Sequence, residues 1–405
     1  MYPLSLELVA FLLGAEAQAA LAELREADLR DEALVARVTE LRKRFDPPEA
    51  AALLDQARLR RKAHGKFREP DGLYFVDEAL EQATSRAVAV YRAGLFEPFE
   101  RVADLGCGIG ADTLALAEAG PLVLAVELDP VRARLAELNV AVRGLSARVR
   151  VVCSDWTAMA LDVDAAYVDP VRRAEGRRVF GLAEMSPPLA AIQVLRDRVP
   201  HVGVKVAPGV DHAEVPPEAE IEFISERGNL KEAFLRFGDL RSGAARIATV
   251  LPGPHQLRSD TPVAQTPVCE PLGYLYEPDP AVIRATLVTT LAARIGAAQI
   301  DPTIAYLTSE APAQTPFSRV WHVERHGHFN LKVLNTWLMA LEVGHVVIKK
   351  RGSPIDPDAF QKRLKVVRGG RSVTVFFTRM QGNPWMILGT EIRPNQTGTC
   401  DEDLP

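Results

Sequence analysis

The spacing of apolar and polar residues divides the chain into three regions. In residues 1–84 apolar side chains recur at helical spacing, and the run from Leu24 to Phe45 contains neither Gly nor Pro, so a helical N-terminal region is predicted. Residues 85–255 alternate short apolar runs with amphipathic stretches, which is typical of a parallel sheet with crossover helices. The strands are predicted at 101–104, 122–127, 149–153, 165–168 and 201–206, with further strand-like runs at 219–225, 231–237 and 245–251.

A third pattern follows the sheet region. The proline-rich stretch at 251–268 predicts a linker or a long hairpin loop. Beyond it, residues 271–395 combine predicted helices at 280–294 and 331–341 with predicted strands at 346–348 and 372–378. We therefore expect an α/β domain at 85–255, preceded by helices and followed by a small α+β domain.

Chemistry enters at the first predicted strand, in the sequence VADLGCGIGADTLALA from Val102 to Ala117. The strand ends at Asp104, and three glycines then form a turn that opens a helix: Gly106, Gly108 and Gly110. Glycine permits positive φ and lets a ligand reach bare backbone, and a helix N-terminus favours negative charge. The pattern predicts a site for a nucleotide-like ligand.

The acidic residues around the turn indicate which nucleotide-like ligand fits the site. The dinucleotide fingerprint G-x-G-x-x-G places its third glycine one position later, and Asp104 before the turn suits the amino group of S-adenosylmethionine better than a pyrophosphate. Glu127 ends the second strand, where a ribose-binding carboxylate is expected, and Asp155 ends the third beside Trp156, where it could accept from an adenine amino group. The alternative is a helix cap, which is the prediction for Asp129 before Pro130.

These motifs resemble those of the class I S-adenosylmethionine-dependent methyltransferases over roughly residues 85–255. The full length resembles a bacterial family of such enzymes with a C-terminal THUMP-like domain, through LEQAT (80–84), VDPVRR (168–173), SPPL (186–189), VKVAPG (204–209) and IKKRG (348–352). The resemblance implies a Rossmann-like methyltransferase sheet, S-adenosylmethionine as cofactor and a THUMP-like domain at 271–395. RNA is the usual supposition for its substrate.

Asp169 and Pro170, after the fourth predicted strand, are the candidate catalytic residues. Similar amino-group methyltransferases carry Asp or Asn followed by two prolines and an aromatic residue; the carboxylate or amide and a proline carbonyl accept from an exocyclic amino group, and the aromatic ring stacks on the base. This chain departs from that pattern at Val171 and Arg172. The departure removes the local aromatic clamp and leaves the methylated atom open.

Basic residues surround this motif and recur elsewhere. Candidate substrate-binding groups are Arg172, Arg173, Lys205, Lys349, Lys350 and Arg351. Guanidinium and ammonium groups bind phosphates, but the same charges also occur as solvated faces or in ion pairs with acids. Lys205 lies inside an apolar strand, so it is expected to pair with Asp169 or to contact substrate. A second basic run lies between Arg58 and Arg68.

Composition limits the other possibilities. A net charge of −5 argues against a general polyanion binder, so any RNA surface must be local. The four cysteines form no C-x-x-C pair, and His322, His326 and His328 lack supporting ligands, so neither a metal site nor a disulfide framework is predicted and a reducing cytoplasm is favoured. The apolar run at 4–13 is too short to span a membrane.

The sequence thus favours a cytoplasmic RNA methyltransferase whose C-terminal domain docks the RNA. Two alternatives stay open: a methyltransferase acting on a protein or a small molecule, and a non-catalytic RNA-binding module that keeps the nucleotide fold as a scaffold.

Overall fold

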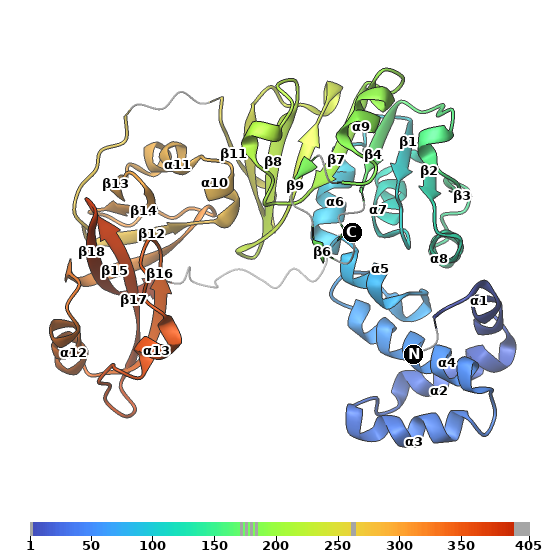
Figure 1. Ribbon diagram of the computed structural model, residues 1–405, viewed down its shortest axis with the longest axis horizontal. Helices are drawn as coiled ribbons and strands as arrows, with labels where there is room; N and C mark the ends of the chain where they lie inside the picture. Colours follow the sequence, from blue (N-terminus) through green and yellow to red (C-terminus); the bar gives the residue numbers. More distant parts are fainter. Residues whose placement is uncertain are drawn as a thin grey trace. The chain divides into compact units, whose positions relative to one another are not determined.

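The computed structural model describes residues 3–170, 173–174, 177–178, 181–182, 185–260 and 265–392. The chain divides into two compact units, which are described separately (Figure 1). The first unit comprises Met1–Ile221 and Glu232–Gly243, and the second comprises Glu222–Lys231 and Ala244–Pro405.

The first unit begins with four helices, drawn in blue in Figure 1: α1 (Leu6–Leu12), α2 (Ala15–Glu26), α3 (Asp31–Leu41) and α4 (Pro47–Ala63). The predicted helical N-terminal region is confirmed, and its run from Leu24 to Phe45 is divided between α2, which ends at Glu26, and α3. The Asp28 carboxylate accepts the backbone N–H of Arg30 at 3.0 Å, a local bond that competes with the helix. A capping box of Asp46 and Glu49 starts α4, with Pro47 in its first turn.

Two short helices, α5 (Asp77–Gln82) and α6 (Arg86–Gly94), lead into the sheet. The five predicted parallel strands are present as β1 (Arg101–Leu105), β2 (Leu122–Glu127), β3 (Val149–Cys153), β4 (Ala165–Val168) and β7 (His201–Val206). The helices between them are α7 (Ala111–Ala119), α8 (Pro130–Val142) and α9 (Leu189–Arg196). Every residue of β4 is buried, as expected for a strand covered on both faces.

The later strands add to this sheet. β9 (Asn229–Arg236) runs antiparallel to β7, with Lys205 opposite Phe234. The other additions are β8 (Glu220–Glu226), β10 (Arg246–Leu251) and β11 (His255–Arg258), giving the order β11-β10-β8-β9-β7-β4-β1-β2-β3. Two short strands, β5 (Arg173–Ala174) and β6 (Arg177–Arg178), pair with each other apart from the sheet. The predicted α/β architecture with a final antiparallel strand is confirmed.

The second unit contains a seven-stranded sheet in the order β13-β14-β12-β15-β18-β17-β16. Its strands are β12 (Tyr274–Pro278), β13 (Ala298–Asp301), β14 (Ile304–Ser309), β15 (Ser318–His328), β16 (Val343–Lys350), β17 (Arg371–Met380) and β18 (Asn383–Ile392). Its helices are α10 (Pro280–Arg284), α11 (Val288–Ile295), α12 (Leu331–Ala340) and α13 (Pro357–Gln361). The single helix expected at 280–294 is divided, because Thr286 adopts a φ of 56°.

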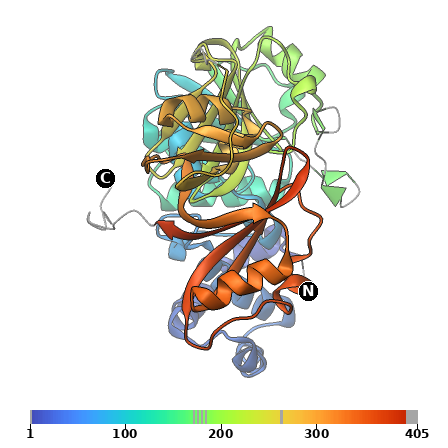
Figure 2. The same ribbon diagram turned by 90° about the vertical axis from the view of Figure 1, so that its left-hand side faces the viewer.

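Alternation along β17 builds a core on each face of that sheet. Phe377 packs with Leu334 and Leu338 of α12, and the neighbouring Phe376 packs with Trp321 on the opposite face. Figure 2 shows α12 lying across the twisted strands. No helix among the described residues is long and apolar enough to cross a membrane.

Candidate active site

The glycine turn joins β1 to α7 in a conformation that other residues rarely adopt. Gly106, Gly108 and Gly110 have φ of 88°, 57° and 90°. A Cβ on Gly106 would lie 2.7 Å from the backbone oxygen of Asp169, too close for an alanine without a shift of the chain. A Cβ on Gly108 would meet nothing within 4 Å. The turn therefore packs closely on the Asp169 backbone at one glycine and stands open at another.

Asp104, at the base of this turn, is completely buried. Its Oδ2 accepts from the Thr113 hydroxyl, whereas its Oδ1 is buried and has no partner among the described residues. Burial raises the pKa of this carboxyl from 3.8 to about 8, and the nearby charge of Asp112 acts in the same direction. An unpartnered buried oxygen at the start of a nucleotide-type turn fits a cationic hydrogen-bond donor.

Glu127, the last residue of β2, braces the turn from the neighbouring strand. Its Oε2 accepts the N–H of Gly108 at 2.8 Å, and its Oε1 accepts the N–H of Asp129 at 2.9 Å. The expected N-cap is present, since Asp129 accepts the backbone N–H groups of Val131 and Arg132. The carboxylate therefore has backbone partners already, and its contact with a ribose stays a prediction.

Asp155 and Trp156 follow β3. The Asp155 carboxylate is exposed and accepts both the N–H and the hydroxyl of Thr157, at 2.9 and 2.7 Å, which lowers its pKa. Trp156 is 7% exposed. The structure thus gives Asp155 a local capping role, and its contact with an adenine amino group also stays a prediction.

Asp169 follows β4 and lies beside Lys205 of β7. The Lys205 ammonium donates to Asp169 Oδ2 at 2.8 Å, and only 5% of the lysine side chain is exposed, against 24% of the aspartate side chain. Pro170 is buried. Because β1, β4 and β7 are adjacent parallel strands, their carboxyl ends bring Asp104, Asp169 and Lys205 to one edge of the sheet.

The structure also contains a buried ionic cluster that the sequence did not predict. Arg92 of α6 is 2% exposed and donates to Asp112 of α7 and to Glu232 of β9. Its guanidinium lies 4.3 Å from the centroid of the Tyr167 ring. Burial works against the charge of Arg92, but Asp112 and Glu232 outweigh it and hold the arginine pKa well above its ordinary value.

A signal for Arg92 exists in the sequence. It occupies the same helical face as Val88, Ala89 and Ala93, all of which are buried. A lone arginine on an apolar face indicates a buried counter-ion, but the pattern does not identify Glu232, which is 140 positions away.

The remaining basic candidates have mixed surroundings. The structure describes nothing of Arg172, and of Arg173 only its backbone in β5. In the second unit, Lys349 forms an ion pair with Glu277, and the Arg351 guanidinium lies 5.4 Å from the centroid of the Tyr306 ring. Lys350 is exposed. Lys350 therefore presents its charge to solvent, whereas Lys349 is engaged within the protein.

The basic run of α4 is largely engaged as well. Arg61 donates to three backbone oxygens around the end of α2, and Lys62 pairs with Asp77 and Glu81, at 2.7 and 3.0 Å. The charged side chains of this run therefore stabilise the packing of the helical region in addition to facing solvent.

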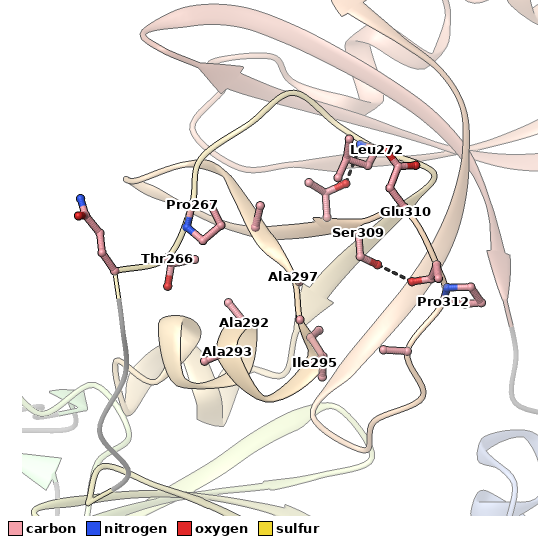
Figure 3. A pocket seen from close by; sticks show the side chains of 16 residues that line it. Thr266, Pro267, Leu272, Ala292, Ala293, Ile295, Ala297, Ser309, Glu310 and Pro312 are labelled. Atoms are coloured by element: carbon pink, nitrogen blue, oxygen red, sulfur yellow. Dashed lines mark hydrogen bonds between the residues drawn. The ribbon is translucent and has the colours of Figure 1, made fainter.

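A hollow of about 720 Å³ lies within the second unit, between α11 and the strands β13 and β14 (Figure 3). Small apolar residues such as Ala292, Ala297 and Pro312 line most of it, and the Ser309 hydroxyl points back to the Ala311 carbonyl. None of the residues of the glycine turn or the Asp169 motif lines it. In the described parts of the chain, no group of three His, Cys, Asp or Glu side chains is placed to hold a metal ion.

Comparison with known proteins connects this geometry to a family. Residues 99–199 match the family model for RNA cap guanine-N2 methyltransferase, residues 318–391 match the THUMP domain-like model, and residues 5–63 match a domain of unknown function. An S-adenosylmethionine-dependent methyltransferase of Mycobacterium tuberculosis is 38% identical over 352 residues, which cover 84% of this chain and 95% of the relative. The chain belongs to the S-adenosylmethionine-dependent methyltransferases.

The fold of this methyltransferase also occurs in a crystal structure from Porphyromonas gingivalis assigned as a methyltransferase. The two are 21% identical, with a TM-score of 0.70, and the match covers 90% of this chain and 99% of the other. A 23S rRNA (uracil(1939)-C(5))-methyltransferase of Acidithiobacillus ferrooxidans is 30% identical over 161 residues, 38% of this methyltransferase and 32% of that relative. The methyl donor of this enzyme is S-adenosylmethionine.

Proposed function

We propose that this methyltransferase modifies RNA, and that Asp169 and the Pro170 carbonyl orient the accepting group. The observation that carries the proposal is that the carboxyl ends of β1, β4 and β7 meet at one edge of the sheet. The Asp169 backbone oxygen lies against Gly106, and the Asp169 carboxylate is held by Lys205. The acceptor motif therefore adjoins the donor-binding turn.

The donor site that we assign follows the first three strands. Asp104 Oδ1 receives the donor amino group, since it is the buried oxygen without a partner among the described residues. The turn of Gly106, Gly108 and Gly110 presents backbone, Glu127 receives the ribose, and Asp155 with Trp156 takes the adenine end. When bound, S-adenosylmethionine supplies an electrophilic methyl group on its sulfonium.

The protein's contribution to the reaction is orientation. Lys205 occupies Asp169 Oδ2, so we assign Oδ1 and the Pro170 carbonyl as the acceptors for the N–H or O–H protons of the nucleophile. Holding the nucleophile in line with the methyl group can lower the barrier by about 7–11 kcal/mol. Direct displacement requires no covalent cysteine intermediate.

RNA is favoured as substrate by separate observations. Two of the matched models are named for RNA cap methylation and for a THUMP-like domain, and one relative is named for 23S rRNA. The exposed Lys350 and the following Arg351 are assigned to RNA phosphates in the second unit, whereas Lys349 pairs with Glu277. Arg172 and Arg173 are assigned to RNA phosphates near the site. An RNA substrate and the free thiols of Cys107, Cys153 and Cys269 favour the cytoplasm.

The test is transfer of labelled methyl from S-adenosylmethionine to total RNA from cells that lack this gene, with wild type and Asp169→Ala in parallel. Label in RNA with the wild type alone supports the proposal. Label with neither protein, while wild type still binds the donor, rejects RNA and directs the search to protein and small-molecule acceptors. Equal labelling by both proteins rejects the role of Asp169.

A further inference from the structure

Thr84 lies in the loop between α5 and α6, at the end of the LEQAT segment, and is 6% exposed. Its hydroxyl oxygen has three close partners in the first unit. Lys205 Nζ donates to it at 3.1 Å, and a guanidinium nitrogen of Arg92 donates to it at 3.2 Å. The hydroxyl itself donates to Asp112 Oδ2 at 3.0 Å. A single side chain therefore connects the buried ionic cluster to Lys205.

The direction of these bonds is fixed by chemistry. A hydroxyl has one proton to donate and two lone pairs, while a lysine ammonium and an arginine guanidinium only donate. Both lone pairs of Thr84 therefore receive the two cations, and its proton has to point to Asp112. The hydroxyl has no further donor or acceptor capacity, and turning its proton away from Asp112 would break one of the three bonds.

These bonds constrain the side chain of Lys205, which would otherwise be flexible. A lysine ammonium is a compact charge on a four-carbon stem, and one ion pair defines its position poorly. Lys205 instead has two fixed acceptors, Asp169 Oδ2 at 2.8 Å and Thr84 Oγ1 at 3.1 Å. The position of Thr84 is fixed in turn by Arg92 and Asp112, which are anchored on α6 and α7.

We propose that Thr84 is a positioning residue of this methyltransferase, which holds the Lys205 ammonium so that Asp169 keeps one orientation toward the accepting group. The proposal rests on the proposed role of Asp169. It extends the active site to the segment before β1, and it gives LEQAT a function that neither the donor site nor the acceptor motif supplies.

The test compares Thr84→Val, which keeps the shape and removes the hydroxyl, with Thr84→Ser, which keeps the hydroxyl. Methyl transfer is measured with labelled S-adenosylmethionine and total RNA from cells lacking this gene, and donor-site affinity is measured by calorimetry with S-adenosylhomocysteine. We expect the valine variant to lose about ten- to hundredfold in kcat, as for a lost hydrogen bond to a charged group, with affinity within twofold of wild type. The serine variant should stay within about threefold.

A double-mutant cycle separates positioning from general damage. If Thr84 acts through Lys205, adding Thr84→Val to Lys205→Met should cost less than about threefold, far below its cost alone. Thr249→Val is the matched control, because Thr249 is a fully buried threonine whose hydroxyl bonds Glu222 in the second unit. This control should keep wild-type activity. Wild-type kcat in Thr84→Val, or additive costs in the cycle, would overturn the proposal.

A spectroscopic readout tests the same contact without any substrate. In proton–nitrogen spectra of lysine ammonium groups, the signal lost in Lys205→Met identifies Lys205. We expect this signal to persist in Thr84→Ser and to broaden or disappear in Thr84→Val; an unchanged signal in Thr84→Val overturns the proposal.

The methyl-transfer activity of Asp169→Asn is assayed beside these variants. If it stays active, the proposed role of Asp169 fails; if it is inactive while Thr84→Val is not, only the positioning role fails.

Discussion

Asp104 of β1 and Lys205 of β7 are two ionisable residues that the sheet buries near the carboxyl ends of the strands on either side of β4. Their surroundings differ. Lys205 has an oppositely charged partner, Asp169, and a neutral one, Thr84. Among the described residues, the side chain of Asp104 has the Thr113 hydroxyl as its one hydrogen-bond partner, and Asp112 adds a like charge nearby. The lysine is therefore compensated within the protein, whereas Asp104 keeps an oxygen for which the chain offers no partner in its described parts.

Replacing Asp104 by Asn should reduce the dependence of stability on pH. The pKa of Asp104 rises from 3.8 to about 8 on folding, so the native state keeps a proton that the unfolded chain releases above pH 4. The wild type should therefore lose stability as pH rises from 4 to 8, by roughly 1.4 kcal/mol for each pH unit from this group. Urea unfolding without donor at pH 5, 6.5 and 8 measures this.

Asp104→Asn should show a flatter profile. It should also bind S-adenosylhomocysteine more weakly, because an amide, unlike the carboxyl, cannot lose a proton to provide a negative charge to an amino group. Parallel pH profiles for the two proteins would contradict the assignment of the proton to Asp104.

At the scale of elements, short-range patterns predicted the sheet well. The strands of the first unit alternate with helices whose caps are local, so Asp129 before Pro130 marks a helix start from sequence alone. The candidate site could be predicted for a related reason, because residues at the carboxyl ends of adjacent parallel strands meet at one edge of the sheet. Asp104, Asp169 and Lys205 came together for that reason.

What the sequence missed depends on geometry without a local pattern. The helix break at Asp28 needs a side-chain bond to the backbone, and the break at Thr286 needs a positive φ in a residue that rarely adopts one. The cluster of Arg92, Asp112 and Glu232 joins α6, α7 and β9, which are far apart along the chain. No spacing rule links such residues.

The glycine turn offers a matched pair of substitutions at this scale. Gly106→Ala should disturb folding near the site, because its Cβ would lie 2.7 Å from the Asp169 backbone oxygen. Gly108→Ala has free space and pays only for its positive φ, about 1–2 kcal/mol. We expect Gly108→Ala to fold but to bind donor more weakly, since its methyl group occupies the open side of the turn.

Thermal unfolding and calorimetry with S-adenosylhomocysteine distinguish the two glycine variants. Equal stability of both would show that the Asp169 backbone yields easily, and wild-type donor affinity in Gly108→Ala would place the donor elsewhere.

At the scale of the whole molecule, net charge conceals how the basic residues are used. The chain carries a formal charge of −5, and many of its cations are committed to internal partners, as Arg61 and Lys62 are in the first unit. In the second unit Lys349 is engaged with Glu277, and Lys350 is exposed. An RNA surface would depend on the few cations that remain available to solvent.

Neighbouring lysines test this distinction. If Lys350 contacts a phosphate, Lys350→Ala should reduce the slope of log K against log salt for RNA binding by about 0.7–0.9. Lys349→Ala should leave that slope unchanged and lower the thermal midpoint, because Lys349 pairs with Glu277 and lies 5.2 Å from the centroid of the Trp321 ring. Filter binding of end-labelled total RNA over a salt series measures the slopes. Identical slopes for Lys350→Ala and wild type would exclude that phosphate contact.

The contact between Gly106 and the Asp169 backbone also bears on redesign of the enzyme. An attempt to change the acceptor specificity of such an enzyme would exchange the loop after β4 as if that loop were independent of the rest of the sheet. Here the backbone oxygen of Asp169, the residue after β4, lies against Gly106 in the turn after β1, and the Asp169 N–H donates to the Leu105 carbonyl at 3.1 Å. A grafted loop with a different backbone path would press on the turn at Gly106, so a new acceptor motif has to be transplanted together with the turn on which it rests.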